Sequence, residues 1–107
     1  MADLFRDLDR AIWSELDAGA AQISSFRRNL QREYIKQLVR LVLRPAQASW
    51  PEDATTLARA SLSELQSKIH NALNAGKVTD STSNAHLHET DDRITSALQA
   101  QMQKPVE

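Results

Sequence analysis

A helix with two different faces opens in the run Ile23-Ser24-Ser25-Phe26-Arg27-Arg28-Asn29-Leu30-Gln31-Arg32-Glu33-Tyr34. At about 100° per residue, one face collects the apolar side chains Phe26, Leu30, Tyr34, Leu38 and Leu41. A second face collects cations at every fourth position, namely Arg28, Arg32, Lys36, Arg40 and Arg44. Arg27 and Gln31 fall among the apolar residues, where a guanidinium and an amide require hydrogen-bond partners. We therefore expect Arg27 and Gln31 to belong to a buried polar network.

The composition indicates one ordered globular domain, residues 1–107, built from few and long elements. Of the 107 residues, 41% are hydrophobic and 25% are charged, which is enough for a single core. Only two glycines and three prolines are present, so turns are scarce. Because the chain has no cysteine, disulfides, thiolate metal sites and thiol redox chemistry are excluded.

Hydrophobic periodicity and capping signals predict four helices and no strand. Ser24 or Ser25 is a good N-cap for the second helix, and Pro45 ends it. Ser49-Trp50-Pro51-Glu52 has the spacing of a capping box, and Gly76 suits the end of the third helix. The predicted helices span about residues 3–17, 25–44, 50–75 and 81–103. Short loops between them favour an all-α fold, an antiparallel up-down-up-down four-helix bundle.

Charge is unevenly distributed along a chain whose net charge is −1. Residues 1–20 carry a net charge of −3 and residues 21–48 a net charge of +5, so the first two helices are expected to attract each other. No apolar run approaches the roughly 20 residues that a membrane span requires. The acidic start Met-Ala-Asp-Leu-Phe-Arg-Asp is unlike the basic opening of a secretion signal. We expect no membrane span and no signal peptide in this chain.

A polar layer is predicted where the end of the first helix meets the starts of the second and fourth helices. The helical wheel places Glu15 in the middle of the first helix's apolar face, at the height of Arg27 in an up-down bundle. His86 lies on the flank of the fourth helix's apolar face at the same level. The predicted network contains Glu15, Arg27, Gln31 and His86, with Asp91 reaching Gln31 or an arginine.

This network has two interpretations, a catalytic or metal site and a core network that fixes the register of the helices. The structural interpretation is favoured, because an arginine beside a carboxylate neutralises it and no nucleophile stands nearby. His86 and His88 are about 200° apart on a helix and cannot close on one ion, unlike an i, i+4 pair. We predict no catalytic residue, no metal site and no cofactor in this chain.

The cationic column and the two tryptophans form the candidate docking surface. The column could follow a phosphate backbone, but it wraps around its helix, and no aromatic residue or glycine-rich loop accompanies it. A solvent-exposed face, whose positive charge is partly balanced by the acidic first helix, is favoured over nucleic-acid binding. Exposed tryptophans are often docking residues, although Trp50 equally suits a cap on the end of the bundle. The candidate docking residues are Trp13, Trp50, Arg28, Arg32, Lys36 and Arg40.

Three segments carry a resemblance to a known family. They are Ile23-x-x-Phe26-Arg27-Arg28-Asn29-Leu30-Gln31-Arg32-x-Tyr34, Asp80-x-x-Ser83-Asn84-Ala85-His86-Leu87 and Arg93-Ile94-x-x-Ala97-Leu98. With Trp13-Ser14-Glu15-Leu16 they make residues 8–100 resemble the C-terminal helical region of large bacterial zinc-dependent metalloproteases of the met-zincin type. In that family an extended His-Glu-x-x-His zinc motif lies far upstream. This chain lacks that motif and its methionine turn, and it has Asn84 where an arginine is more usual.

The resemblance implies a place in a larger protein rather than a reaction. It implies a non-catalytic C-terminal helical domain that supports or docks on the parent's catalytic domain, where zinc is expected, in a periplasmic or secreted bacterial protein. The chain is then a fragment of a longer polypeptide. The alternative is an independent helical module for protein interaction or homodimerisation. A third interpretation, in which the polar layer is catalytic, is disfavoured.

Overall fold

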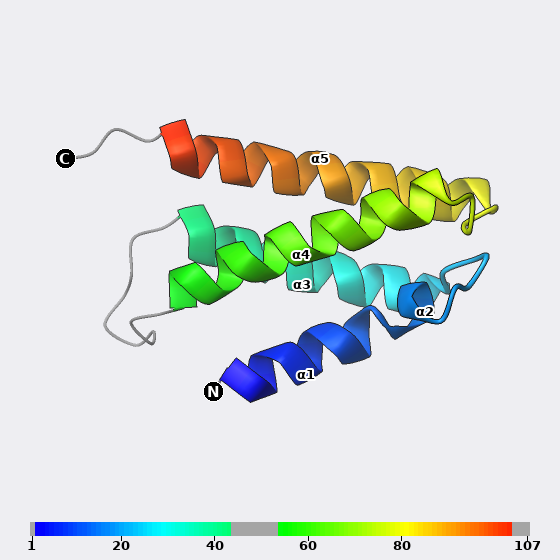
Figure 1. Ribbon diagram of the computed structural model, residues 1–107, viewed down its shortest axis with the longest axis horizontal. Helices are drawn as coiled ribbons and strands as arrows, with labels where there is room; N and C mark the ends of the chain where they lie inside the picture. The colour runs from blue at the N-terminus through cyan, green and yellow to red at the C-terminus, as the bar shows by residue number, and fades with distance from the viewer. Residues whose placement is uncertain (1, 44–53, 104–107) are drawn as a thin grey trace.

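The computed structural model describes residues 2–43 and 54–103, and every regular element in these ranges is a helix. The helices are α1 (Ala2–Ile12), α2 (Ser14–Asp17), α3 (Ser25–Leu43), α4 (Ala54–Asn74) and α5 (Ser81–Gln103). The three long helices α3, α4 and α5 pack together, and α1 lies against both α3 and α4 (Figure 1). The prediction of an all-α fold is confirmed.

The first predicted helix, at about residues 3–17, is broken at Trp13. This residue has φ −103° and ψ 14°, and it separates α1 from the single turn of α2. Its side chain is fully buried (0% exposed) and belongs to the same core as Ile12 and Leu16. A helical wheel drawn through residue 13 assumes an unbroken helix, and it therefore put the indole on the wrong side. The prediction that Trp13 is an exposed docking residue is wrong.

The start of α3 is fixed by hydrogen bonds from its own cap and from α2. The backbone N–H of Arg27 donates to Ser24 Oγ at 3.1 Å, as expected of an N-cap serine. The N–H of Ser24 donates to Glu15 Oε2 at 2.9 Å. A carboxylate at the N-terminus of a helix also interacts favourably with the helix dipole. The first turn of α3 is therefore held to the chain segment that precedes it.

The buried face of α3 is rotated from the predicted one. Its buried side chains are Gln31, Tyr34, Ile35, Leu38 and Val42. Phe26, which the helical wheel places in the core, is 72% exposed, and Leu30 is 36% exposed. The observed face centres near Leu38, which puts Phe26 about 120–140° away from it. The prediction that Phe26 belongs to the core is wrong.

One hydrophobic core runs between the packed helices. From α4 it takes Ala58, Leu62, Leu65, Ile69 and Ala72, and from α5 it takes Leu87 and Ile94. Positions three or four residues apart lie on one face of a helix, so each helix turns a continuous apolar stripe inward. No helix in the described part of the chain is long and apolar enough to cross a bilayer.

The turn after α4 uses a glycine in the way that the sequence predicts. Gly76 has φ +67°, a conformation that glycine adopts without steric cost. The N–H of Gly76 donates to the carbonyl of Leu73, and the N–H of Lys77 donates to that of Ala72, each at 3.2 Å. This pair of bonds is a Schellman motif, which satisfies the last carbonyls of α4. Residues 44–53, with Trp50 and the predicted start of the third helix, lie outside the described residues.

The connection between α4 and α5 lies beside the loop that precedes α3. The N–H of Thr79 donates to the carbonyl of Ala21 at 2.9 Å, so the two connections touch through their backbones. Asp80 then caps α5, since its Oδ2 accepts a hydrogen bond from the N–H of Ser83 at 2.9 Å. α3 and α5 therefore both begin at this end of the molecule (Figure 1).

Candidate functional site

The start of α3 and the start of α5 bring two of the predicted network residues together. His86 Nε2 lies 2.6 Å from Gln31 Oε1, and the two side chains are 2% and 0% exposed. Gln31 Nε2 in turn donates to the carbonyl of Ile12 at 3.3 Å, at the end of α1. The amide of Gln31 thus connects three helices, and both of its polar atoms have partners in the core.

The imidazole of His86 is held in its neutral form. Burial lowers the pKa of His86 to about 4, and the nearby Arg32 and Arg28 guanidiniums add to this effect, while Glu89 opposes it. A neutral imidazole carries one N–H, and the carbonyl oxygen of Gln31 is an acceptor, so Nε2 is the protonated nitrogen. His86 is therefore a hydrogen-bond donor inside the core rather than a general base open to a substrate.

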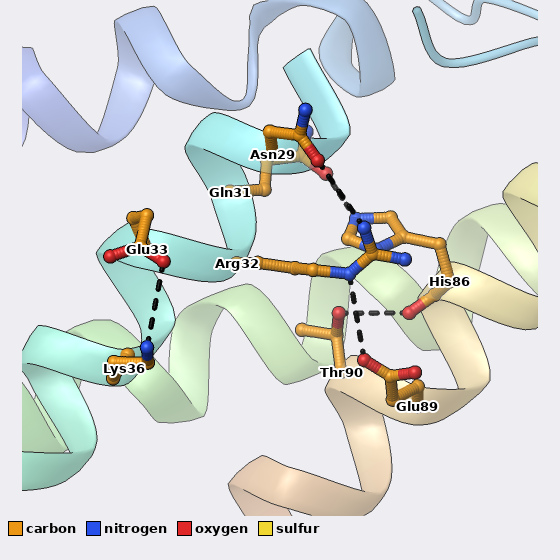
Figure 2. A network of polar contacts seen from close by, with 8 residues as sticks. All are labelled: Asn29, Gln31, Arg32, Glu33, Lys36, His86, Glu89 and Thr90. Atoms are coloured by element: carbon orange, nitrogen blue, oxygen red, sulfur yellow. Dashed lines mark hydrogen bonds and ion pairs between the residues drawn. The ribbon is translucent and has the colours of Figure 1, made fainter. Parts of the chain in front are cut away.

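Arg32 reaches from α3 toward α5 over this pair, between the side chains of Asn29 and Glu89 (Figure 2). Its Nη1 donates to Asn29 Oδ1 at 3.4 Å, and its Nε lies 3.6 Å from Glu89 Oε1. The Arg32 side chain is 41% exposed, so this ion pair is screened by water and contributes little to stability. Its position places a fixed positive charge beside the buried imidazole.

Arg27 and Glu15 lie near the same end but are not paired with each other. Arg27 Nη1 donates to the carbonyl of Ala11 at 2.6 Å, in the last turn of α1. Glu15 is only partly buried, and its carboxylate accepts from the backbone of Ser24 instead. The break at Trp13 turns Glu15 away from the position that a continuous helix would give it. Arg27 therefore bonds a backbone carbonyl at the end of α1, and Glu15 bonds a backbone N–H just before α3, so the two charged groups do not neutralise each other.

Asp91 belongs to a separate cluster on the α4 side of α5. Its Oδ1 accepts from Gln66 Nε2 at 2.9 Å and lies 2.8 Å from His70 Nε2. Gln66 Nε2 also donates to Thr95 Oγ1 at 2.6 Å. Asp91 does not bond Gln31 or an arginine, because it lies more than one turn beyond His86 and faces α4. Of the predicted network, only Gln31 and His86 bond each other, and Glu15, Arg27 and Asp91 each bond other partners.

Sequence reasoning missed the contact that joins the starts of α3 and α5 directly. Ser83 Oγ accepts from the N–H of Ile23 at 2.8 Å and donates to Asp80 Oδ2 at 3.0 Å. Ser83 and Ile23 are both fully buried. The serine three residues after the Asp80 cap was visible in the sequence, but nothing in a one-dimensional pattern identifies a partner 60 residues away.

A second buried polar group, also missed, links α1, α3 and α4. Asp9 Oδ2 accepts from Ser61 Oγ at 2.8 Å, and this carboxylate also interacts with the hydroxyl of Tyr34. Burial raises the pKa of Asp9, and burial together with the Asp9 carboxylate raises the pKa of Tyr34 well above its usual range. A hollow of about 320 Å³ opens beside it, lined by Asp9, Arg10, Glu64 and Lys68.

The other predicted docking residues lie on or near the outer side of α3. Lys36 and Arg40 are exposed, and Lys36 Nζ lies 3.6 Å from Glu33 Oε2 (Figure 2). Arg28 is partly buried, since its Nη1 donates to the carbonyl of Ile23 at 2.6 Å. Arg28 therefore has a structural role in closing the loop before α3, which the spacing of the cationic column did not reveal.

The arrangement as a whole is that of an all-helical protein in which polar side chains tie the ends of helices together. Within the described residues, no group of three or more histidine, aspartate or glutamate side chains is placed to hold a metal ion. No protein-family model, no curated protein and no solved structure matches this chain.

Proposed function

We propose that this chain is the non-catalytic C-terminal helical domain of a bacterial zinc metalloprotease-like protein and that it supports or docks on the catalytic domain of that protein. In this proposal the fold is an antiparallel up-down-up-down four-helix bundle, with α1 and α2 together as its first member. Zinc and the catalytic residues belong to the parent's catalytic domain. The parent protein is periplasmic or secreted.

One observation supports this proposal more than any other. The segments that resemble the metalloprotease family, around residues 23–34 and 80–87, are far apart in sequence but interlock through their own motif residues. Ile23 bonds Ser83, and Gln31 bonds His86. A motif whose polar members bond one another in a core is accounted for by folding rather than by chemistry on a substrate. This favours a supporting domain over a catalytic one.

The gene that encodes the chain supplies the first test. We expect an open reading frame that continues upstream of residue 1 and encodes a helix with a His-Glu-x-x-His motif. A genuine start codon at Met1 with no such sequence upstream would instead favour the alternative, an independent helical module for protein interaction or homodimerisation.

A protease assay provides the second test. The 107-residue chain, incubated with zinc and an unfolded protein substrate, is expected to give no hydrolysis above a zinc-only blank. Zinc-dependent cleavage that is lost in the variants His86→Gln and Asp91→Asn would overturn the proposal, because it would place the chemistry in this chain.

A further inference from the structure

The carboxylate of Asp9 lies where three helices meet. Its Oδ2 accepts from Ser61 Oγ of α4 at 2.8 Å, and the carboxylate also interacts with the hydroxyl of Tyr34 on α3. Among the described side chains of α1, which are those of residues 7–12, only that of Asp9 bonds another described helix. Asp9 is therefore the one side-chain hydrogen bond by which this part of α1 holds its neighbours.

The rest of the attachment of α1 is concentrated in its last turn. Ile12 is the only buried residue among residues 7–12, and the carbonyls of Ala11 and Ile12 accept from Arg27 and Gln31. Within the described residues, α1 packs on α3 and α4 but not on α5, and it lies at the edge of the molecule (Figure 1). A helix attached in this way can open locally while the other helices stay packed.

The partners of Asp9 suit both of its protonation states. A hydroxyl is both a donor and an acceptor, so those of Ser61 and Tyr34 fit a carboxylate as well as a carboxylic acid. Burial disfavours only the ionised form, and it raises the pKa of Asp9 although the two hydroxyls oppose this effect. The charge of Asp9 therefore changes the free energy of its burial, while its partners stay in place.

The charged groups around Asp9 leave most of this cost in place. On α4, Glu64 raises the pKa of Asp9 further, and Lys68 has the smallest opposing effect. Lys68 Nζ also lies 3.2 Å from Asp17 Oδ2, so its charge is shared with α2. Arg10 lines the hollow beside Asp9 but forms no ion pair within the described residues. The ionisable groups of the described residues that face Asp9 are Arg10, Tyr34, Glu64 and Lys68.

We propose that Asp9 is a proton-dependent latch for α1: protonation of its carboxyl group tightens the packing of α1 on α3 and α4, and ionisation loosens it. When α1 moves away, the carboxyl group enters water and releases its proton to the solvent. Docking of α1 therefore takes up a proton. This inference concerns the fold itself and does not depend on the proposed function.

The direction of the latch follows from the sign of the linkage. The pKa of docked Asp9 is raised above the usual value of 3.8, so the added stability of docking is complete below pH 3.8. It is lost as the pH rises through the pKa of the docked carboxyl. His86 has the opposite effect, since its lowered pKa makes acid destabilise the whole fold. Local opening of α1 and global unfolding should therefore respond to pH in opposite directions.

Amide hydrogen exchange in the 107-residue chain, followed by NMR at a series of pH values, tests this inference. Exchange rates divided by the intrinsic rate at each pH give the protection of the α1 amides, which measures local opening. The α4 amides in the same spectra report unfolding of the whole domain. The side-chain carboxyl ¹³C shift of Asp9 gives its titration midpoint directly, in the folded chain and in concentrated urea.

We expect the midpoint of Asp9 to be higher in the folded chain than in urea. The protection of α1 relative to α4 should fall as the pH rises, by tenfold for each pH unit between the two midpoints. Asp9→Asn keeps an oxygen for Ser61 but does not ionise, so its α1 should keep the same protection throughout. Asp7→Asn is the matched control, because Asp7 is exposed on the same helix, and it should follow the wild type.

Any one of three results would overturn the inference. The first is a midpoint of Asp9 in the folded chain at or below that in urea. The second is equal protection of α1 and α4 at every pH, which would show that α1 does not open by itself. The third is the same pH profile of α1 protection in Asp9→Asn and in the wild type. The first two need only the wild-type chain, so they decide the question even if Asp9→Asn does not fold.

Discussion

His86 Nε2 lies 2.6 Å from Gln31 Oε1 in the core of the molecule, where a side chain of α5 donates a hydrogen bond to a side chain of α3. The carbonyl of Ile12 accepts from the same amide, so the contact extends to α1. His86 and Gln31 are 2% and 0% exposed, so water cannot take the place of either side chain if the other is removed. Each of the two residues therefore depends on the other for this hydrogen bond.

Replacing Gln31 by alanine should destabilise the fold by about 2–3 kcal/mol, because the N–H of His86 and the carbonyl of Ile12 lose their partner inside the core. Gln37→Ala is the matched control, since Gln37 is an exposed glutamine on the same helix, and its effect should stay within about 0.5 kcal/mol. Urea denaturation followed by circular dichroism measures both values. Equal effects of the two substitutions would contradict this role of Gln31.

Acidification should destabilise the protein through His86. The folded-state pKa of about 4 is below the usual value of 6.5, so the unfolded chain binds the proton first as the pH falls. The stability that His86 confers is complete above pH 6.5 and is lost progressively down to about pH 4, by about 3 kcal/mol at 1.36 kcal/mol per pKa unit. The measurement is the free energy of unfolding against pH.

The comparison with His86→Gln isolates this effect. Glutamine keeps an N–H donor for Gln31 but does not titrate, and the other acidic groups, including Asp9 with its raised pKa, are common to both proteins. The wild-type chain should lose more stability than the variant between pH 6.5 and pH 4. Parallel pH profiles for the two proteins would show that His86 is not the group responsible.

Tyr34 should resist ionisation for as long as the protein is folded. Burial and the neighbouring Asp9 carboxylate raise the pKa of Tyr34, so the folded state disfavours the phenolate and stability is lost as the pH rises past about 10. The chain has a single tyrosine, so absorbance near the tyrosinate band reports Tyr34 alone.

We expect the tyrosinate absorbance to appear in one step together with the loss of helical circular dichroism. The same chain in concentrated urea is the control, and it should titrate near the usual pKa of about 10. A smooth titration near that value while the helices persist would contradict the burial of the Tyr34 hydroxyl.

Trp13 should behave as a core residue. In a Trp50→Phe background, the fluorescence of Trp13 should have a blue-shifted maximum and should be protected from acrylamide, because the indole is 0% exposed. Trp13→Ala should cost about 3–5 kcal/mol by leaving a cavity in the core. Emission typical of a solvated indole would show that Trp13 lies at the surface and would contradict its place in the core.

The sequence was sufficient for α3, for the end of α4 and for α5, because their signals are local, but it did not predict the break at Trp13. Ser24 and Gly76 act as caps at the positions where capping preferences predict them, and Asp80 caps α5. The faces of those helices were harder to predict, since a wheel has no information about a break such as the one at Trp13. α1 stops at Ile12, Phe26 is 72% exposed, and the buried face of α3 is centred on Gln31 and Leu38 instead.

The candidate site was predictable only where a polar residue stood out on an apolar face. Gln31 and His86 were found in this way, and they are bonded. Ser83, Ser61 and Asp9 were not, because small or acidic residues at the edge of a helix face look solvated until the neighbouring helix is placed. Arg27 was recognised as unusual, but its partner is a backbone carbonyl, which no side-chain pattern encodes.

The contacts at the shared end of α3 and α5 differ greatly in the length of chain that each one closes. The shorter loops, of 9 and 16 residues, are closed by the contacts of Glu15 with Ser24 and of Ala11 with Arg27. The longer loops, of 55 and 60 residues, are closed by the contacts of Gln31 with His86 and of Ile23 with Ser83. Loop closure becomes entropically costlier with length, so contacts of the first kind are expected to form earlier. Gln31 takes part in both kinds, because its bonds to Ile12 and His86 close 19 and 55 residues. We therefore expect α5 to join α1, α2 and α3 through Gln31 late in folding.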